Sequence, residues 1–356
     1  MKYFAGLVFV LGRFSSVSFF CFSFPKAKDR LREPPCATLA GVFNQATYVK
    51  DNDPRAIHPN KQKMSSISFS LNGSLVTVEN PDPSETLNDY IRHRTQFKGT
   101  KLGCGEGGCG ACAVMLSTVD PATGNEFHRT VNSCLRPLVA CDGAAITTTE
   151  GLGSEATGLH PVQKRIADFN GSQCGFCTPG MVMSTYAALL RVADESKAAD
   201  AAGSDPRALG LVMEEAFDGN ICRCTGYRPI LEAARSLVDE TVTDQVGVGC
   251  KADIRPVTGV GPAEGASAPP AIPAEIRDAG AAETKEFHGP TLHWHRPTTT
   301  GAALELLTTH GANARFAVSN TSVGIYKEEP ETVLIDLGAI AALKEVRGVA
   351  VIVLAG

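Results

Sequence analysis

The sequence predicts an α+β protein, and three observations support this class. Alternating apolar residues flank an Asn-Gly pair at residues 72–73, which is typical of a β-hairpin. Four stretches between residues 161 and 238 carry apolar residues at helical spacing. Two further apolar runs, at residues 316–318 and 333–337, have the length of strands. Strands are therefore expected first, helices next, and a second strand-containing region at the C-terminal end.

Composition narrows the classes of partner. The chain has 356 residues, enough for two or three domains, and its hydrophobic content of 43% is ordinary for a globular protein. The formal net charge is −5, and no stretch gathers Lys and Arg into a long basic run, so nucleic-acid binding is not expected. Small molecules and other proteins are the expected partners.

The first 63 residues do not match the patterns of the rest of the chain. Lys2 precedes an apolar run, residues 3–24, that Arg13 interrupts, as in a secretory signal, but no clear small-residue cleavage site follows. The run is too interrupted for a membrane span. We expect residues 1–63 to be a poorly ordered extension on a cytoplasmic protein that is not associated with a membrane. The alternative is a genuine targeting signal.

A small strand-rich domain is predicted over residues 64–152. Residues 67–71 and 76–78 form the expected hairpin around the Asn-Gly turn, and Ser84 is placed to cap a short helix that runs through Ile91. The other predicted elements are a strand at 113–117, a turn at 120–124 and a strand at 127–131.

A helical domain is predicted over residues 153–240. The polar, Ala-rich stretch at 194–206 is predicted to be a loop within it. The four predicted helices of this domain span 161–169, 181–192, 209–217 and 230–238.

A linker and a third region follow. Residues 241–289 hold many Pro, Gly and Ala residues without a steady apolar period, which indicates a linker. The third region, over 290–356, contains a predicted helix at 302–309, and Trp294 is expected to be a packing residue.

Eight of the twelve cysteines fall into two sets of four. The first set has the spacing C-x4-C-x2-C followed by a distant fourth cysteine, which is the spacing of plant-type [2Fe–2S] proteins. Five of the eight residues from Gly103 to Gly110 are glycine, and such a loop brings backbone N–H groups close to a cluster. A four-cysteine zinc site and disulfides are the alternatives, and the spacing favours iron and sulfur over both. The set consists of Cys104, Cys109, Cys112 and Cys134.

The second set pairs a C-x2-C motif with a C-x-C motif. Cys174 and Cys177 stand just before Pro179, and Cys222 and Cys224 stand just before a helix expected to start near Pro229. Two helix N-termini would thus meet at one anionic site. Zinc stays an alternative for this set. The remaining cysteines, Cys21, Cys36, Cys141 and Cys250, match neither pattern, and Cys141 is expected to be a small buried side chain.

Three stretches, at residues 104–112, 171–180 and 219–229, together resemble the iron-sulfur half of the molybdenum hydroxylases, the family of xanthine dehydrogenase and aldehyde oxidase. The resemblance covers residues 65–239. It implies a ferredoxin-like β-grasp domain followed by an all-α four-helix domain, with one [2Fe–2S] cluster held by each set of four cysteines. It also places Gln173 close to the pterin of a molybdenum cofactor in a missing domain or partner.

Residues 314–327 resemble the first flavin-binding loop of the same family. This resemblance implies a partial α+β FAD-binding domain over 290–356. Ser319 stands where the family has glycine, and its side chain counts against a close approach of the backbone to FAD. The residues expected to contact FAD are Val318, Ser319, Asn320, Thr321, Ser322 and Val323.

The resemblance implies an electron-transfer role. Two clusters would relay electrons from a molybdenum centre to FAD during hydroxylation of a purine or an aldehyde. NAD or oxygen would be the final acceptor, and the full enzyme would be a homodimer. An aldehyde oxidase-like enzyme is the alternative to a xanthine dehydrogenase-like one. Two other hypotheses are a separate electron-transfer subunit and a non-catalytic remnant, and the flavin-like start of residues 290–356 argues against the separate subunit.

Overall fold

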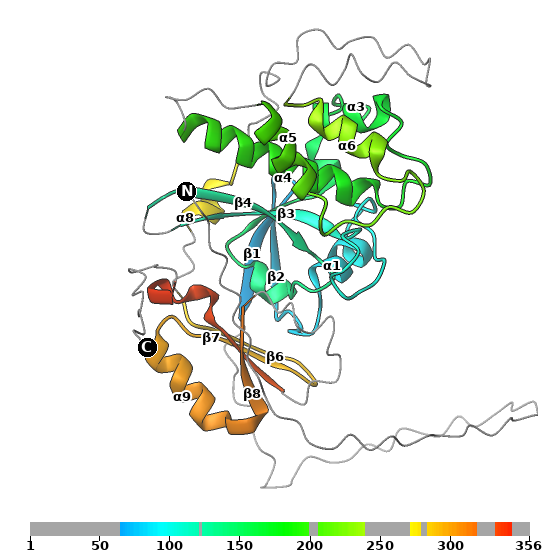
Figure 1. Cartoon of the computed structure of the whole chain (residues 1–356). Coiled ribbons are helices and arrows are strands. Elements are labelled where there is room, and N and C mark those ends of the chain that lie inside the picture. Colours follow the sequence, from blue (N-terminus) through cyan, green and yellow to red (C-terminus); the bar gives the residue numbers. More distant parts are fainter. Residues whose placement is uncertain are drawn as a thin grey trace, which may run out of the picture. The chain divides into compact units, whose positions relative to one another are not determined.

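A computed structural model describes residues 65–120, 123–198, 206–238, 271–278, 283–318 and 332–343. The expected extension at 1–63 lies outside these ranges, as do Cys21, Cys36 and Cys250 and the predicted FAD contacts at 319–323. The coarse expectation of an α+β protein is confirmed, because helices and two small sheets occur together (Figure 1).

The first sheet has five strands in the order β2-β1-β5-β3-β4. Neighbouring strands are antiparallel except β1 and β5, which run parallel. The predicted hairpin is confirmed: β1 and β2 pair around Asn72 and Gly73, and both turn residues have positive φ angles. The strands are β1 (Ser66–Leu71), β2 (Ser74–Glu79), β3 (Ala113–Val119), β4 (Glu126–Asn132) and β5 (Ala145–Thr147).

Helix α1 (Leu87–Arg94) begins later than the sequence predicted. The expected cap, Ser84, instead donates its hydroxyl to Asp82 Oδ1 at 2.7 Å. Thr86 is the N-cap, since its Oγ1 accepts the Asp89 N–H at 3.1 Å. The capping prediction was therefore wrong by two residues, because two neighbouring residues have hydroxyls and Asp82 engages the first of them.

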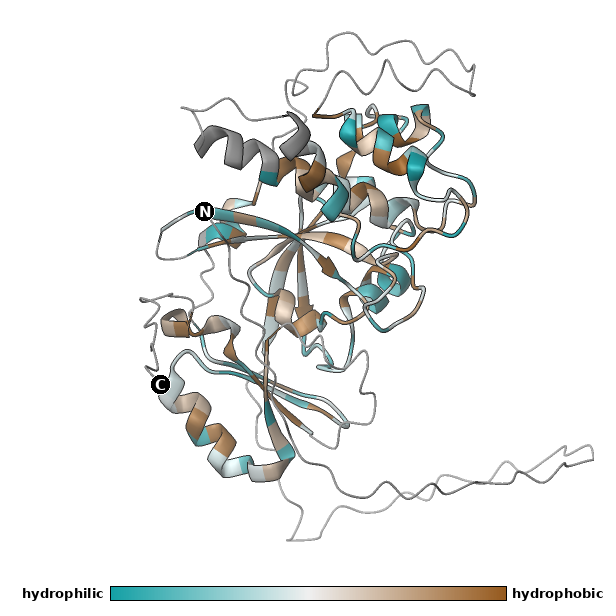
Figure 2. Cartoon of the chain, viewed as in Figure 1, coloured by the Kyte–Doolittle hydropathy of each residue, from teal (hydrophilic) through white to brown (hydrophobic). Residues whose placement is uncertain are grey.

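Strand β3 contributes to two hydrophobic cores. Val114 and Leu116 face the core that contains β1 and α1, whereas Met115 belongs to a core formed mainly by helices. Successive side chains of a strand point to opposite faces, so one strand serves both cores. Figure 2 shows the apolar residues on this sheet and on the helices that cover it.

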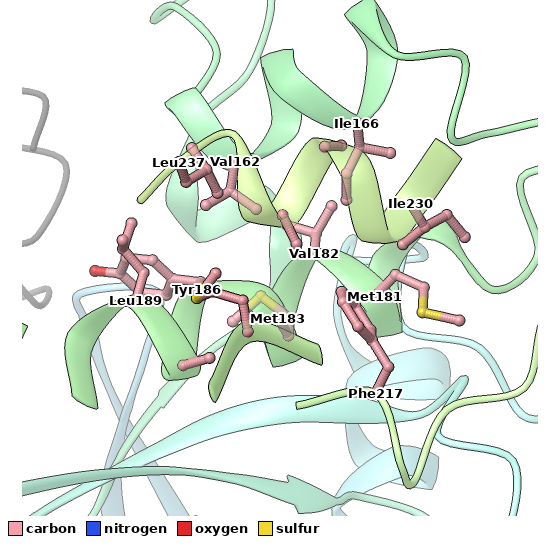
Figure 3. Close-up of a cluster of buried hydrophobic side chains, with 14 of the residues drawn as sticks. Val162, Ile166, Met181, Val182, Met183, Tyr186, Leu189, Phe217, Ile230 and Leu237 are labelled. Carbon is pink, nitrogen blue, oxygen red and sulfur yellow. The ribbon is translucent and has the colours of Figure 1, made fainter. Parts of the chain in front are cut away.

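Helices α3, α4 and α6 pack around the second core, in which Val162, Ile166, Val182, Tyr186 and Ile230 point toward one another (Figure 3). The four helices predicted for this region are confirmed, and a short helix α2 precedes them. Their bounds are α2 (Thr149–Leu152), α3 (Pro161–Asp168), α4 (Thr178–Ala198), α5 (Pro206–Glu215) and α6 (Arg228–Arg235).

Helix α4 corrects one prediction. Residues 194–198, expected to start a loop, continue the helix to Ala198, and α5 begins at Pro206. Ala, Glu and Lys favour helix even without an apolar period in the sequence. The rest of the expected loop, residues 199–205, lies outside the described residues.

The expected linker at 241–289 contains regular structure in its described part, which is a second correction. Helix α8 (Ala274–Asp278) buries Ile276 with Ile272 against Ala145, and β6 (Lys285–His288) buries Phe287. Two or three well-placed apolar residues thus suffice to order short elements that show no periodic pattern in the sequence.

A second sheet has the strand order β6-β7-β9-β8. Strand β7 (His293–Arg296) is antiparallel to β6 and parallel to β9 (Val333–Asp336), which is parallel to β8 (Ala314–Ala317). Helix α9 (Thr300–His310) confirms the predicted helix, and Trp294 is fully buried, as expected of a packing residue. The described 3-10 turns are η1 (Leu138–Cys141), η2 (Gly311–Asn313), η4 (Leu337–Ala339) and η5 (Ala341–Leu343).

Asp142 joins the β6–β7 hairpin to the first sheet. Its Oδ2 accepts from Lys285 Nζ and from Arg296 Nη2, both at 2.6 Å, and its Oδ1 accepts the Ser68 N–H at 2.8 Å. The carboxylate and the guanidinium are nearly buried, with side-chain exposures of 9% and 6%. Burial acts to raise the pKa of Asp142, but these three partners together outweigh it and hold that pKa below its ordinary value.

Among the described helices, none combines the length and the apolar character needed to cross a membrane.

Candidate metal centres

The glycine-rich loop at 103–110 ends just before β3 and carries the first two cysteines. The Cys104 N–H points at Cys109 Sγ at 3.4 Å, and the Glu106 N–H points at Cys104 Sγ at 3.3 Å. A Cβ at Gly103 would lie 2.8 Å from Cys109 Sγ, so only glycine fits beside this sulfur. The loop therefore presents backbone N–H groups to sulfur atoms, as an iron-sulfur site requires.

The four sulfurs of the first set lie together as two pairs. Cys112, immediately before β3, and Cys134, in the turn after β4, are buried with their Sγ atoms 3.3 Å apart. Cys104 is hydrogen-bonded to Cys109 in the same loop, and Cys104 is exposed. The structure thus brings together all four cysteines that the sequence predicted for this site, one pair buried and one pair near the surface.

The second set shows the same division. Cys174 is hydrogen-bonded to Cys224, and Cys177 is hydrogen-bonded to Cys222. Cys174 and Cys224 are exposed, whereas Cys222 is buried. The two motifs lie in the loops just before α4 and α6, as predicted from Pro179 and Pro229. Every cysteine in the described ranges is a free thiol.

Within three of these pairs one sulfur has a lowered pKa and the other has a raised pKa. The hydrogen bond between Cys112 and Cys134 lowers the pKa of Cys112 and raises that of Cys134. A hydrogen bond from the Phe176 N–H lowers the pKa of Cys174. Burial, followed by the bond to Cys222, raises the pKa of Cys177 to about 12. Thiolate, the form that binds metal, is thus favoured at one member of these pairs.

The two loops touch through their backbones. The Ile221 N–H donates to the carbonyl of Cys109 at 2.9 Å. A Cβ at Gly110 would overlap the carbonyl oxygen of Gly219, and a Cβ at Gly180 would overlap that of Gly110. Gly110 also has a φ of +66°, which favours glycine. Two glycines, Gly110 and Gly180, therefore allow the two sets of cysteines to approach at backbone distance.

Polar residues that sequence reasoning missed hold these loops in place. Asn132 Nδ2 donates to the Gly107 carbonyl at 2.8 Å, and buried Asn220 donates to Ser184 Oγ at 2.7 Å. Thr225 Oγ1 lies 3.1 Å from Cys222 Sγ and lowers the pKa of that thiol against the opposing effect of burial. The available signal was position, since Asn220 and Thr225 flank the C-x-C motif in the stretch at 219–229.

The other predicted site residues are more exposed or lie outside the described ranges. Gln173 is exposed and directly precedes Cys174. Val318, directly after β8, is 63% exposed, and residues 319–323 of the predicted flavin loop lie outside the described ranges. Cys141 is fully buried, as expected for a cysteine outside both sets.

Comparison with known proteins agrees with these two sites. Residues 69–139 match the family described as "2Fe-2S iron-sulfur cluster binding domain", and residues 148–235 match the "[2Fe-2S] binding domain" family. Xanthine dehydrogenase of Drosophila subobscura is 41% identical over 81% of this chain and 22% of the relative. Indole-3-acetaldehyde oxidase of Arabidopsis thaliana is 37% identical over 78% of this chain and 21% of the relative.

The chain spans about a fifth of the length of these two curated relatives. Among solved structures, the aldehyde oxidoreductase from Desulfovibrio gigas is 29% identical with a TM-score of 0.40, and the match covers 58% of this chain and 22% of that one. The relatives are oxidoreductases, and two [2Fe–2S] domain families match this chain one after the other. The chain belongs to the molybdenum hydroxylase family and carries the N-terminal iron-sulfur region of that family.

Proposed function

We propose that the eight cysteines hold two [2Fe–2S] clusters that relay electrons. The observation that carries this proposal is the division of each set into two sulfur pairs. A [2Fe–2S] cluster has two irons and four thiolate ligands, so each iron takes one pair. A structural zinc ion would instead need all four sulfurs around one centre.

We assign the first cluster to Cys104, Cys109, Cys112 and Cys134 in a ferredoxin-like β-grasp domain, and the second to Cys174, Cys177, Cys222 and Cys224 in a helical domain. When bound, such clusters accept and donate single electrons. The reduction potential of the plant type is on the order of −400 mV. The chain's own residues tune that potential. N–H groups of the glycine-rich loop stabilise the more negative, reduced form, while burial of Cys112 and Cys134 opposes it.

The direction of the relay follows from the assigned neighbours. Gln173 adjoins Cys174, so we place the second cluster nearer to the pterin of a molybdenum cofactor, held by a further domain or partner. The first cluster then faces FAD, for which residues 318–323 supply part of the site. The hydrogen bond between Ile221 and Cys109 provides a short path between the two loops.

The activity of the whole enzyme is proposed from the names of the relatives. Xanthine dehydrogenase and indole-3-acetaldehyde oxidase favour oxidation of a purine or an aldehyde. NAD or oxygen would be the final acceptor, and the full enzyme would be a homodimer located in the cytoplasm. This chain contributes the electron path of that reaction.

Magnetic interaction between the clusters tests the relay. In the chain reconstituted with iron and sulfide and then fully reduced, the EPR spectrum is expected to show two signals, each broadened by the other cluster. Cys104→Ser should leave an unbroadened signal from the second cluster, and Cys174→Ser one from the first. If the wild-type spectrum equals the sum of the two single-variant spectra, the clusters are too far apart to exchange electrons as proposed.

A further inference from the structure

The β6–β7 hairpin has two chemically different faces. Lys285 and Phe287 on β6 lie opposite Arg296 and Trp294 on β7, and this face packs against the first sheet through a shared core and through Asp142. The other face carries only ionisable side chains at its paired positions. It consists of Glu286 opposite His295 and His288 opposite His293.

His288 and His293 bring two ring nitrogens together. Their Nδ1 atoms lie 3.0 Å apart, at which one ring donates a hydrogen bond to the other when no metal is bound, and their ring centroids are 5.0 Å apart. Bonds from a transition metal to imidazole nitrogen are about 2.0–2.1 Å, so two neighbouring ligands of one ion lie about 3.0–3.4 Å apart. The strands hold the two Cα atoms directly opposite each other, which fixes this separation without requiring any movement of the backbone.

We propose that His288 and His293 form a two-imidazole site for a divalent transition-metal ion, with water as the remaining ligands. Imidazole suits Zn²⁺, Cu²⁺ and Ni²⁺, and cross-strand ligands preorganise the site. The described residues contain no group of three or more His, Cys, Asp or Glu side chains arranged for one metal ion, so the site relies on two protein ligands. It is separate from the cysteine centres and does not depend on their function.

Glu286 lies beside one of the two ligands. Its Oε2 lies 3.8 Å from His288 Nε2, the nitrogen that faces away from His293. This distance is too long for a hydrogen bond, but the negative charge still favours the tautomer with a proton on Nε2, which leaves the lone pair of Nδ1 available to the metal. Glu286 also offsets part of the charge of a bound cation. It therefore acts as a positioning residue for this site.

The pair is accessible to metal ions from solvent. The side chain of His288 is 37% exposed, and that of Glu286 is 53% exposed. The neighbouring His295 is nearly buried, and its Nδ1 lies 3.4 Å from Glu286 Oε1. Its ring centroid lies 5.8 Å from that of His288 and 5.4 Å from that of His310. His310 is a nearby histidine that is not one of the two proposed ligands, so it serves as a matched control.

Nickel titration of the full chain tests the site. The probe is NiCl2, added to chain without an affinity tag and with its iron-sulfur clusters loaded, so that the cysteines compete less. Calorimetry is expected to show one Ni²⁺ per chain at this site, and His288→Ala and His293→Ala each to remove it or weaken it at least about tenfold. Glu286→Gln should weaken binding about tenfold while the stoichiometry stays at one.

His310→Ala should bind nickel like the wild type. Thermal unfolding of each metal-free variant checks that the substitutions leave the fold intact. We expect unfolding temperatures close to that of the wild type, because both rings lie on the face of the hairpin that points away from the first sheet. Wild-type affinity in both His288→Ala and His293→Ala would overturn the proposal. An equal loss in His310→Ala would also overturn it, because the ligands would then not be the cross-strand pair.

Discussion

The backbone N–H of Ile221 donates a hydrogen bond of 2.9 Å to the carbonyl oxygen of Cys109. Cys109 belongs to the first set of cysteines, and Ile221 directly precedes Cys222 of the second. The contact joins two loops that lie more than a hundred residues apart in the sequence, at the point where each presents a ligand. Contacts between backbone atoms of the two loops therefore determine the distance between the two sites.

Gly180 tests this packing without backbone strain. A Cβ there would overlap the backbone oxygen of Gly110, so Gly180→Ala must push the glycine-rich loop away from α4. We expect a loss of about 2 kcal/mol in unfolding free energy, as in overpacked cores, although alanine favours helix. The matched control is Gly210→Ala in α5, where the nearest atom is 3.9 Å away. Urea unfolding should show a gain of up to about 1 kcal/mol for the control.

Gly110 tests the same contact from the first loop. Gly110 and Gly105 have φ angles of +66° and +67°, so alanine costs about 1–2 kcal/mol of backbone strain at either position. Only at Gly110 would the new Cβ also overlap a backbone oxygen, that of Gly219. Gly110→Ala is therefore expected to release the clusters faster than Gly105→Ala. The decrease of visible absorbance with time measures the rate of release. Equal rates would show that the contact with Gly219 does not support the sites.

Asp142 is expected to dominate the attachment of the β6–β7 hairpin. Asp142→Asn keeps the shape of the side chain but leaves Lys285 and Arg296 without an anion in a nearly buried position. Breaking a buried pair in this way costs about 3–5 kcal/mol. Asp168→Asn, which breaks an exposed pair of 2.7 Å with Lys164, should cost less than about 1 kcal/mol. Chemical unfolding that shows similar losses for both variants would contradict the role of Asp142.

The same carboxylate predicts a pH dependence. The folded-state pKa of Asp142 lies below its ordinary value of 3.8, so ionised Asp142 stabilises the fold above that pH. The stabilisation is lost as the pH falls from about 4 through the folded-state pKa. The difference in unfolding free energy between wild type and Asp142→Asn should thus be constant near neutral pH and shrink below about pH 4. If this difference in unfolding free energy instead grew as the pH fell, the pKa of Asp142 would be raised in the folded state and not lowered.

Local patterns in the sequence predicted local features well. The Asn72-Gly73 turn fixes the hairpin because both residues accept positive φ angles. Cysteine spacing and glycine content predicted which side chains would meet, since a short loop with few side chains limits where its sulfurs can lie. Helix starts at Pro179 and Pro229 followed from the conformational preference of proline.

Contacts between distant residues could not be predicted in this way. Asp142 and Arg296 are 154 residues apart, and nothing in the pattern around either one indicates the other. The overlap of Gly180 with Gly110 is also invisible in the sequence, because a glycine at the start of a helix has several common explanations. The β6 strand escaped prediction since a four-residue strand with one buried side chain, Phe287, leaves almost no period.

The iron and sulfide content of the reconstituted chain tests the central claim most directly. Two [2Fe–2S] clusters require about four irons and about four acid-labile sulfides per chain. Cys104→Ser and Cys174→Ser should each lower both numbers to about two. Cys141→Ser, at a buried cysteine outside both sets, should keep about four of each. Fewer than about four irons in the wild type, or an unchanged iron content in Cys174→Ser, would contradict the assignment of two clusters to the two sets of cysteines.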